Sequence, residues 1–194
     1  MKLVHVNLKN KLFLSQYVKN HQMKVHLKFL LICFSVMPII SCSVETETHI
    51  VETPVLELKV TGPLFQGSNT STATWEYKLE ELFPEVNNEI VIENARVSSI
   101  KIIPKSGVDY PELGKVVMEM KPKNNGMSRV GLLETNFDNN QANSLNVAEI
   151  QEDFDEAFSD ERLTFVGDFD LLAEEYFDDL AFDLIVTFEI QTRK

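Results

Sequence analysis

Residues 180–191, L-A-F-D-L-I-V-T-F-E-I-Q, carry the clearest structural signal in the chain. Apolar and polar residues alternate here with a period of two, the spacing of a strand that buries one face. The apolar face comprises Leu180, Phe182, Leu184, Val186, Phe188 and Ile190. The pattern predicts a long β-strand near the C-terminus whose large apolar side chains lie in the core.

The same alternation recurs upstream at residues 56–60, 72–79 and 115–121. Shorter runs predict further strands at residues 89–93, 96–103, 128–133 and 162–166. Turn residues separate these runs, and Asn125-Gly126 is the sharpest hairpin signal among them. The prediction is a mostly β fold, an antiparallel immunoglobulin-like sandwich of about seven to nine strands with one or two short helices.

Two segments compete with this all-β interpretation. Val147, Ile150, Phe154 and Phe158 follow the helical spacing of one apolar stripe. Asn146 is placed to cap such a helix, with a glutamate three residues later as in a capping box. A second short helix is predicted around residues 171–180.

The first 42 residues differ from the rest of the chain in charge. They contain six lysines and no acidic residue, whereas residues 43–194 hold 12 basic and 30 acidic side chains, a formal charge of −18. A basic leader on an acidic body is typical of a targeting segment. The acidic body disfavours nucleic acid as a partner, because phosphate binding requires a basic surface. It disfavours attraction to anionic lipid for the same reason.

The leader has the three parts of a secretory signal. A positive segment at residues 23–28 precedes the apolar residues 29–40, and the small Ser41 precedes Cys42. Twelve residues of helix rise about 18 Å, well short of a hydrocarbon core of roughly 30 Å. We therefore expect a cleaved signal rather than a spanning helix. Because Met23 begins a complete signal by itself, residues 1–22 are interpreted as an upstream extension.

Residues 39–42, I-I-S-C, resemble the lipobox of bacterial lipoproteins. The resemblance implies transfer of diacylglycerol to the Cys42 thiol, cleavage before that residue and a lipid anchor in a bacterial membrane, for which we expect the outer membrane. It covers about 20 residues and says nothing of the domain that follows. A lipobox, an acidic tether and a small β domain together are similar in layout to envelope lipoproteins of Bacteroidota. The alternatives are an ordinary signal peptide or an N-terminal strand that contains a cysteine.

The resulting domain prediction has three parts. Residues 1–41 form the leader, residues 42–53 a lipidated polar tether, and residues 54–194 a single sandwich domain. Cys33 lies in the apolar part of the leader, so the mature chain would retain Cys42 as its one cysteine. The domain would then have no disulfide, and its stability must come from the core.

The domain lacks the residues of common catalytic sites. Its one histidine outside the leader is His49, which we place in the tether, so a Ser-His-Asp or Cys-His set is not expected. A zinc site built on histidine and cysteine is not expected either. Two carboxylates would suffice for a glycosidase, but with 30 acids a suitable pair arises by chance.

The acidic residues concentrate in the last 61 positions, which carry 17 acidic and 3 basic side chains. Oxygen-rich clusters suit Ca²⁺, and we single out four candidate ligands. They are Asp153, Asp155, Asp168 and Asp170. No segment matches a calcium-binding loop motif, so we expect a solvated acidic face and no metal or cofactor. On a strand, Asp168 and Asp170 would share one face, with Phe169 pointing inward.

Three aromatic residues are candidate platforms for stacking a ligand. Trp75 and Tyr77 lie on the apolar side of their predicted strand, which favours core packing over sugar stacking. Tyr110 precedes a proline in a predicted loop and is the better candidate for exposure.

These features favour a non-enzymatic envelope lipoprotein whose sandwich binds or supports another envelope component, a protein or a glycan. The alternative is calcium-dependent adhesion or glycan binding, and a third is a hydrolase that uses carboxylates alone. An exposed aromatic patch facing away from the anchor would favour binding. A deep cleft that holds two acids would favour the enzyme.

Overall fold

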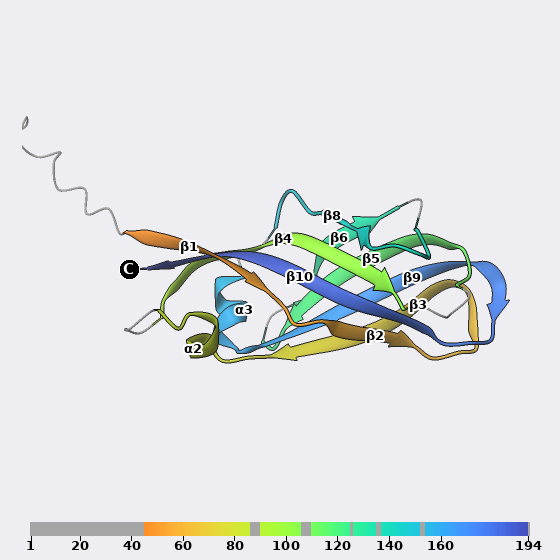
Figure 1. Cartoon of the computed structure of the whole chain (residues 1–194), viewed down its shortest axis with the longest axis horizontal. Helices are drawn as coiled ribbons and strands as arrows, with labels where there is room; N and C mark the ends of the chain where they lie inside the picture. Colours follow the sequence, from red (N-terminus) through yellow and green to blue (C-terminus); the bar gives the residue numbers. More distant parts are fainter. Residues whose placement is uncertain are drawn as a thin grey trace, which may run out of the picture. The chain divides into compact units, whose positions relative to one another are not determined.

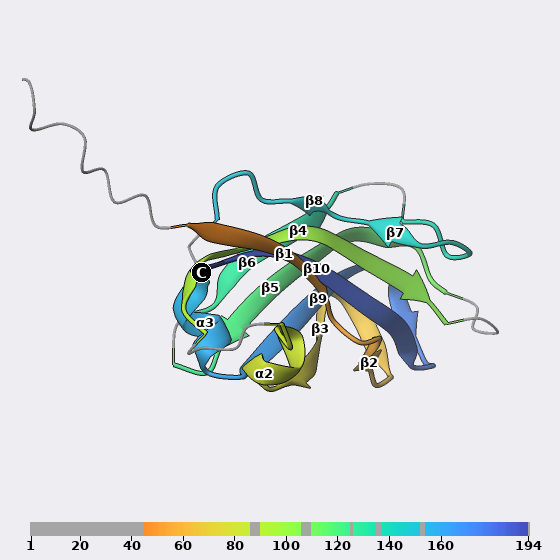
Figure 2. The ribbon, with the colours of Figure 1, turned by 60° about the vertical axis from the view of Figure 1, so that its left-hand side comes forward.

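A computed structural model describes residues 45–85, 90–105, 110–124, 126–134, 137–151 and 154–193. These residues form two antiparallel five-stranded sheets packed face to face, with two short helices (Figures 1 and 2). The predicted antiparallel sandwich is confirmed, with ten strands in the described part. Cys42 and Asp153 lie outside the described residues, as does Asn125 of the predicted hairpin turn.

The first sheet contains β1 (Thr46–Glu52), β2 (Leu56–Val60), β4 (Ile92–Pro104), β7 (Asn143–Ser144) and β10 (Leu180–Arg193). The second contains β3 (Leu64–Glu76), β5 (Leu113–Pro122), β6 (Ser128–Leu133), β8 (Asn146–Val147) and β9 (Arg162–Tyr176), in the order β3-β9-β5-β6-β8. The helices are α2 (Leu79–Leu82) and α3 (Asp155–Ser159).

β10 is the central strand of the first sheet. One side pairs with β4, and the other pairs with β2 over its first half and β1 over its second. Every second residue from Leu180 to Thr192 is buried, and the residues between are partly exposed. The predicted C-terminal strand with an inward apolar face is therefore confirmed.

The core is rich in aromatic side chains contributed by both sheets. Phe169 of β9 stacks on Phe182 of β10, with ring centroids 4.4 Å apart. Trp75 and Phe188 stack at 6.2 Å elsewhere in the core. Trp75 and Tyr77 are buried, as the alternation predicted. Tyr110 is buried too, which contradicts the prediction of an exposed loop residue.

The interpretation of residues 46–52 as a tether is wrong, because they form β1. Its seven residues pair in register with Thr187 to Arg193, and Val51 is buried. Beyond β1, the Thr53 amide donates to the Val186 carbonyl at 2.9 Å, and the Thr53 hydroxyl accepts from the Val186 amide at 3.1 Å. The segment looked polar because an edge strand buries few side chains. His49 accordingly lies in a strand.

The long helix predicted from the apolar stripe is also wrong. Val147 belongs to β8, Ile150 is 93% exposed, and α3 spans only Asp155–Ser159. Phe154 rather than Asn146 is the N-cap residue. Only the last two members of the stripe, one helical turn apart, are buried together, because the segment before them pairs with the edge of β4.

The helix predicted around residues 171–180 is replaced by the end of β9. Phe65 pairs with Glu175 but Gly67 pairs with Leu171, so β9 bulges by two extra residues here. Gly67 adopts φ +101°, a conformation that glycine accepts most easily. The bulge interrupts the alternation of apolar residues, which is why the pattern resembled a helix.

Candidate functional site

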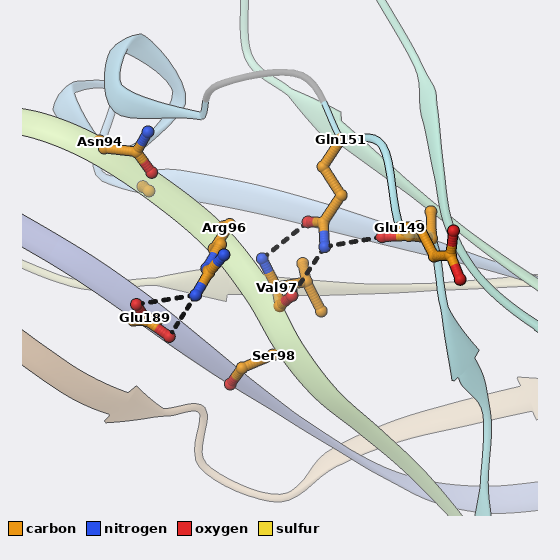
Figure 3. A pocket seen from close by; sticks show the side chains of 9 residues that line it. Asn94, Arg96, Val97, Ser98, Glu149, Gln151 and Glu189 are labelled. Carbon is orange, nitrogen blue, oxygen red and sulfur yellow. Dashed lines mark hydrogen bonds and ion pairs between the residues drawn. The ribbon is translucent and has the colours of Figure 1, made fainter.

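A pocket with a volume of about 460 Å³ lies beside β4 (Figure 3). Its walls come from β4, from the segment between β8 and α3, and from Glu189 on β10. The polar lining residues are Asn94, Arg96, Ser98, Glu149, Gln151 and Glu189. The pocket is thus an open polar hollow at a sheet edge.

One wall is formed by the Gln151 side chain, which bonds to the β4 backbone in the way a neighbouring strand would. The Gln151 amide accepts a hydrogen bond from the Val97 amide at 2.8 Å and donates to the Val97 carbonyl at 2.8 Å (Figure 3). The Phe154 amide donates to the Ala95 carbonyl nearby. β7 pairs with β4 only at Lys101 and Ile102, so these contacts satisfy the β4 edge beyond it.

The other wall is an ion pair on the outer face of the sheet. Arg96 donates to both carboxylate oxygens of Glu189, at 2.9 and 2.8 Å (Figure 3). The Ser98 hydroxyl donates to the Thr187 carbonyl. Arg96, Glu189 and Gln151 are thus occupied by these contacts. Ser98, the one hydroxyl among the lining residues, bonds to a carbonyl rather than to a base.

His49 has a structural environment. Its Nε2 atom lies 2.9 Å from the Thr192 hydroxyl, and its ring meets the edge of Phe83 at a centroid distance of 5.0 Å. These contacts attach β1 to β10 and to the segment after α2. They hold the imidazole at the sheet edge, with no carboxylate among its contacts.

The candidate calcium ligands lie on two different elements. Asp168 and Asp170 share the outer face of β9 with Phe169 buried behind them, as predicted. The Asp168 carboxylate accepts from the Ser68 hydroxyl at 2.6 Å, and Asp170 pairs across the strands with Lys115. Asp155 begins α3 and accepts from the Glu156 amide. Within the described ranges, no three His, Cys, Asp or Glu residues are grouped to hold a metal ion.

Charged residues of the first sheet join its strands at the end where β10 begins. Lys59 lies 2.7 Å from Asp179, and Lys105 lies 2.7 Å from Glu57. The hydrogen bond and charge of Lys105 lower the pKa of Glu57, and those of Lys59 do the same for Asp179. A glycosidase acid needs the opposite shift. These carboxylates are therefore suited to ion pairing.

Tyr110 closes the core at this same end. Its hydroxyl donates to the Ala181 carbonyl and accepts from the Lys105 amide, and its ring lies 5.3 Å from that of Phe182. A tyrosine can be buried when its hydroxyl finds such partners. The loop position suggested exposure because the sequence does not show that β10 begins beside it.

Three exposed apolar residues lie at this end, on β3, on β9 and in the turn after β9, and the sequence had not indicated them. Phe65, Leu172 and Phe177 are 57%, 44% and 74% exposed, and we call them the distal patch. Phe65 pairs directly with Glu175 across β3 and β9, and Phe177 follows two residues after Glu175. The available signal was the Leu171-Leu172 doublet, which places one leucine outside the core whatever the strand register.

Neither models of known protein families nor curated proteins match this chain. In the part of the chain that the structure describes, no helix has the length and hydropathy needed to cross a bilayer.

Proposed function

We propose that this chain is a lipid-anchored protein of the bacterial envelope whose sandwich serves as a non-enzymatic binding module. The anchor is the predicted acylated Cys42, and the binding surface is the distal patch. The partner is another component of the envelope.

The observation that carries the proposal is the position of the distal patch. The chain enters the domain through β1, whose first residue pairs with Arg193 at the end of β10. The turn from β9 to β10, which carries Phe177, lies at the other end of that strand (Figure 1), and Phe65 and Leu172 are on the adjoining ends of β3 and β9. Fourteen residues of strand span about 45 Å. An anchor before β1 and a patch at the opposite end suit a module that presents a surface away from its membrane.

The remaining features support binding over catalysis. In the pocket beside β4, Arg96 is paired with Glu189 and Gln151 is bonded to Val97, and His49 is held by Thr192. Exposed apolar side chains that lie together are typical of interaction sites.

Replacing the lipobox cysteine tests the proposal. Cys42→Ala should prevent both acylation and processing, leaving a larger precursor that carries no lipid. Mass spectrometry of the native protein should find lipid on an N-terminal Cys42. The matched control is Cys33→Ala, which changes the other cysteine and should be processed normally. A mature protein that begins elsewhere, or a Cys42→Ala chain that is still lipidated, would show the anchor to be wrong.

A further inference from the structure

The distal patch is displayed on a firmly held turn. The Gly62 amide donates to the Asp179 carboxylate at 2.9 Å, and Lys59 bonds to the same carboxylate. A Cβ atom on Gly62 would lie 2.6 Å from the Phe177 carbonyl oxygen, so the β2–β3 and β9–β10 turns touch through their backbones. Phe177 is therefore presented in a set position, and little conformational entropy is lost when a partner covers it.

The residues around the patch are mostly acidic, and the exposed Lys115, which follows Gly114 on β5, lies opposite Asp170. Residues 61–66, 110–114 and 171–180 contain five acidic residues and no lysine or arginine. Asp179 is neutralised by Lys59, whereas Glu112, Glu174, Glu175 and Asp178 are exposed. The nearest basic residue on β4's side, Lys105, is paired with Glu57 and Asp183. The patch is thus apolar with an acidic rim.

The apolar patch and its acidic rim together favour one kind of binding partner over others. An anionic lipid surface would be repelled by four exposed carboxylates. A second copy of the chain would bring two acidic rims together, which opposes self-association. A cationic segment gains from both features, because its charges can pair with the rim and lie over the phenylalanine rings.

We infer that the distal patch binds a cationic peptide segment of a partner protein, in which arginine or lysine alternates with apolar residues. The inference rests on the proposed function and specifies the class of its partner. Apolar side chains of the segment cover Phe65 and Phe177, and its basic side chains meet Glu174, Glu175 and Asp178. Opposite charges steer the encounter and the aromatic residues anchor the complex.

The test uses the full chain in non-ionic detergent and a blocked peptide Arg-Leu-Arg-Leu-Arg that carries an uncharged dye. We expect saturable binding by fluorescence anisotropy, at least tenfold weaker for Phe177→Ala. Glu174→Gln with Glu175→Gln should weaken binding and reduce its dependence on salt. The peptide Glu-Leu-Glu-Leu-Glu should not bind. The inference is wrong if the basic peptide does not bind, or if it binds the Phe177→Ala chain equally well.

Matched controls come from β1 and the residue before it, along the second half of β10. Ile50→Ala removes a side chain that is 67% exposed, and Glu45→Gln with Glu52→Gln removes two exposed charges. Both chains should bind the peptide as the parent does. If they weaken binding as much as the patch variants, the peptide responds to overall charge or hydrophobicity and the inference fails.

Two further measurements address the other occupants. Phe177→Trp in liposomes with brominated phosphatidylglycerol should show no quenching at the new tryptophan, and sedimentation should find no association that Phe177→Ala abolishes. Either effect would assign the patch to lipid or to a second copy. Peptide binding is also measured on Cys42→Ala. The Cys42→Ala chain should bind the peptide as the parent does. A parent chain that carries no lipid but binds the peptide contradicts only the anchor, and a lipidated parent chain that does not bind contradicts only this inference.

Discussion

At the scale of the residue, the buried phenol of Tyr77 makes the free energy of unfolding depend on pH. Its ring lies between Trp75 and Phe158, and its hydroxyl donates to the Phe158 carbonyl at 3.2 Å. Burial raises the pKa of the phenol, and the charges of Glu161 and Asp160 add to the shift. The neutral form is the one the fold accommodates. Tyr77 in the unfolded chain has a pKa of about 10. Below that pH the neutral phenol contributes its full stability to the fold, and this stability is lost as the pH rises above it.

The variant Tyr77→Phe isolates this effect. At pH 7 it should lower the free energy of unfolding by about 1 kcal/mol, through loss of the hydrogen bond. Above pH 10 the parent should lose about 1.4 kcal/mol per pH unit relative to the variant. In urea unfolding curves, the parent's advantage in free energy of unfolding over Tyr77→Phe should therefore shrink above pH 10. Near pH 11 the variant should become the more stable of the two. Tyr110, whose pKa burial also raises, is present in both chains and cancels. A difference that stays constant up to pH 11 would contradict the assignment.

At the scale of the element, β10 supplies most of one wall of the core. Phe188 contacts the rings of Trp75, Phe158 and Phe165 and is fully buried. Phe188→Ala should lower the free energy of unfolding by about 3–5 kcal/mol, because it leaves a cavity among these rings. Phe177→Ala, the same change three residues before β10, should cost no more than about 0.5 kcal/mol. Equal losses in urea unfolding would show that the burial of β10 is not what stabilises the fold.

At the scale of the whole molecule, acidic residues repel one another. Residues 43–194 carry a formal charge of −18, and raising the salt from 0.01 M to 0.1 M shortens the Debye length from roughly 30 Å to about 10 Å. The melting temperature should therefore rise smoothly with salt. At 0.15 M salt, millimolar Ca²⁺ should add no more than Mg²⁺. A saturable gain specific to Ca²⁺, absent from Asp168→Asn with Asp170→Asn, would instead indicate a calcium site.

The sequence by itself determined the regular strands and how they combine. Residues 56–60 and 128–133 were predicted as strands with the bounds of β2 and β6, and residues 180–191 lie within β10. Trp75, Tyr77 and Phe169 were assigned to the core correctly. These predictions succeed because a strand with one buried face requires apolar and polar residues to alternate along the sequence.

Tertiary structure alone decided the elements that depend on a distant partner. β1 exists because β10 offers it an edge, and residues 148–151 are not helical because the Gln151 side chain bonds to Val97 on β4. Tyr110 is buried only because Ala181 accepts its hydroxyl. The distal patch forms where two turns far apart in sequence meet at Gly62. Hydrogen bonds across long sequence separations leave no local periodicity, so pattern alone could not place these residues.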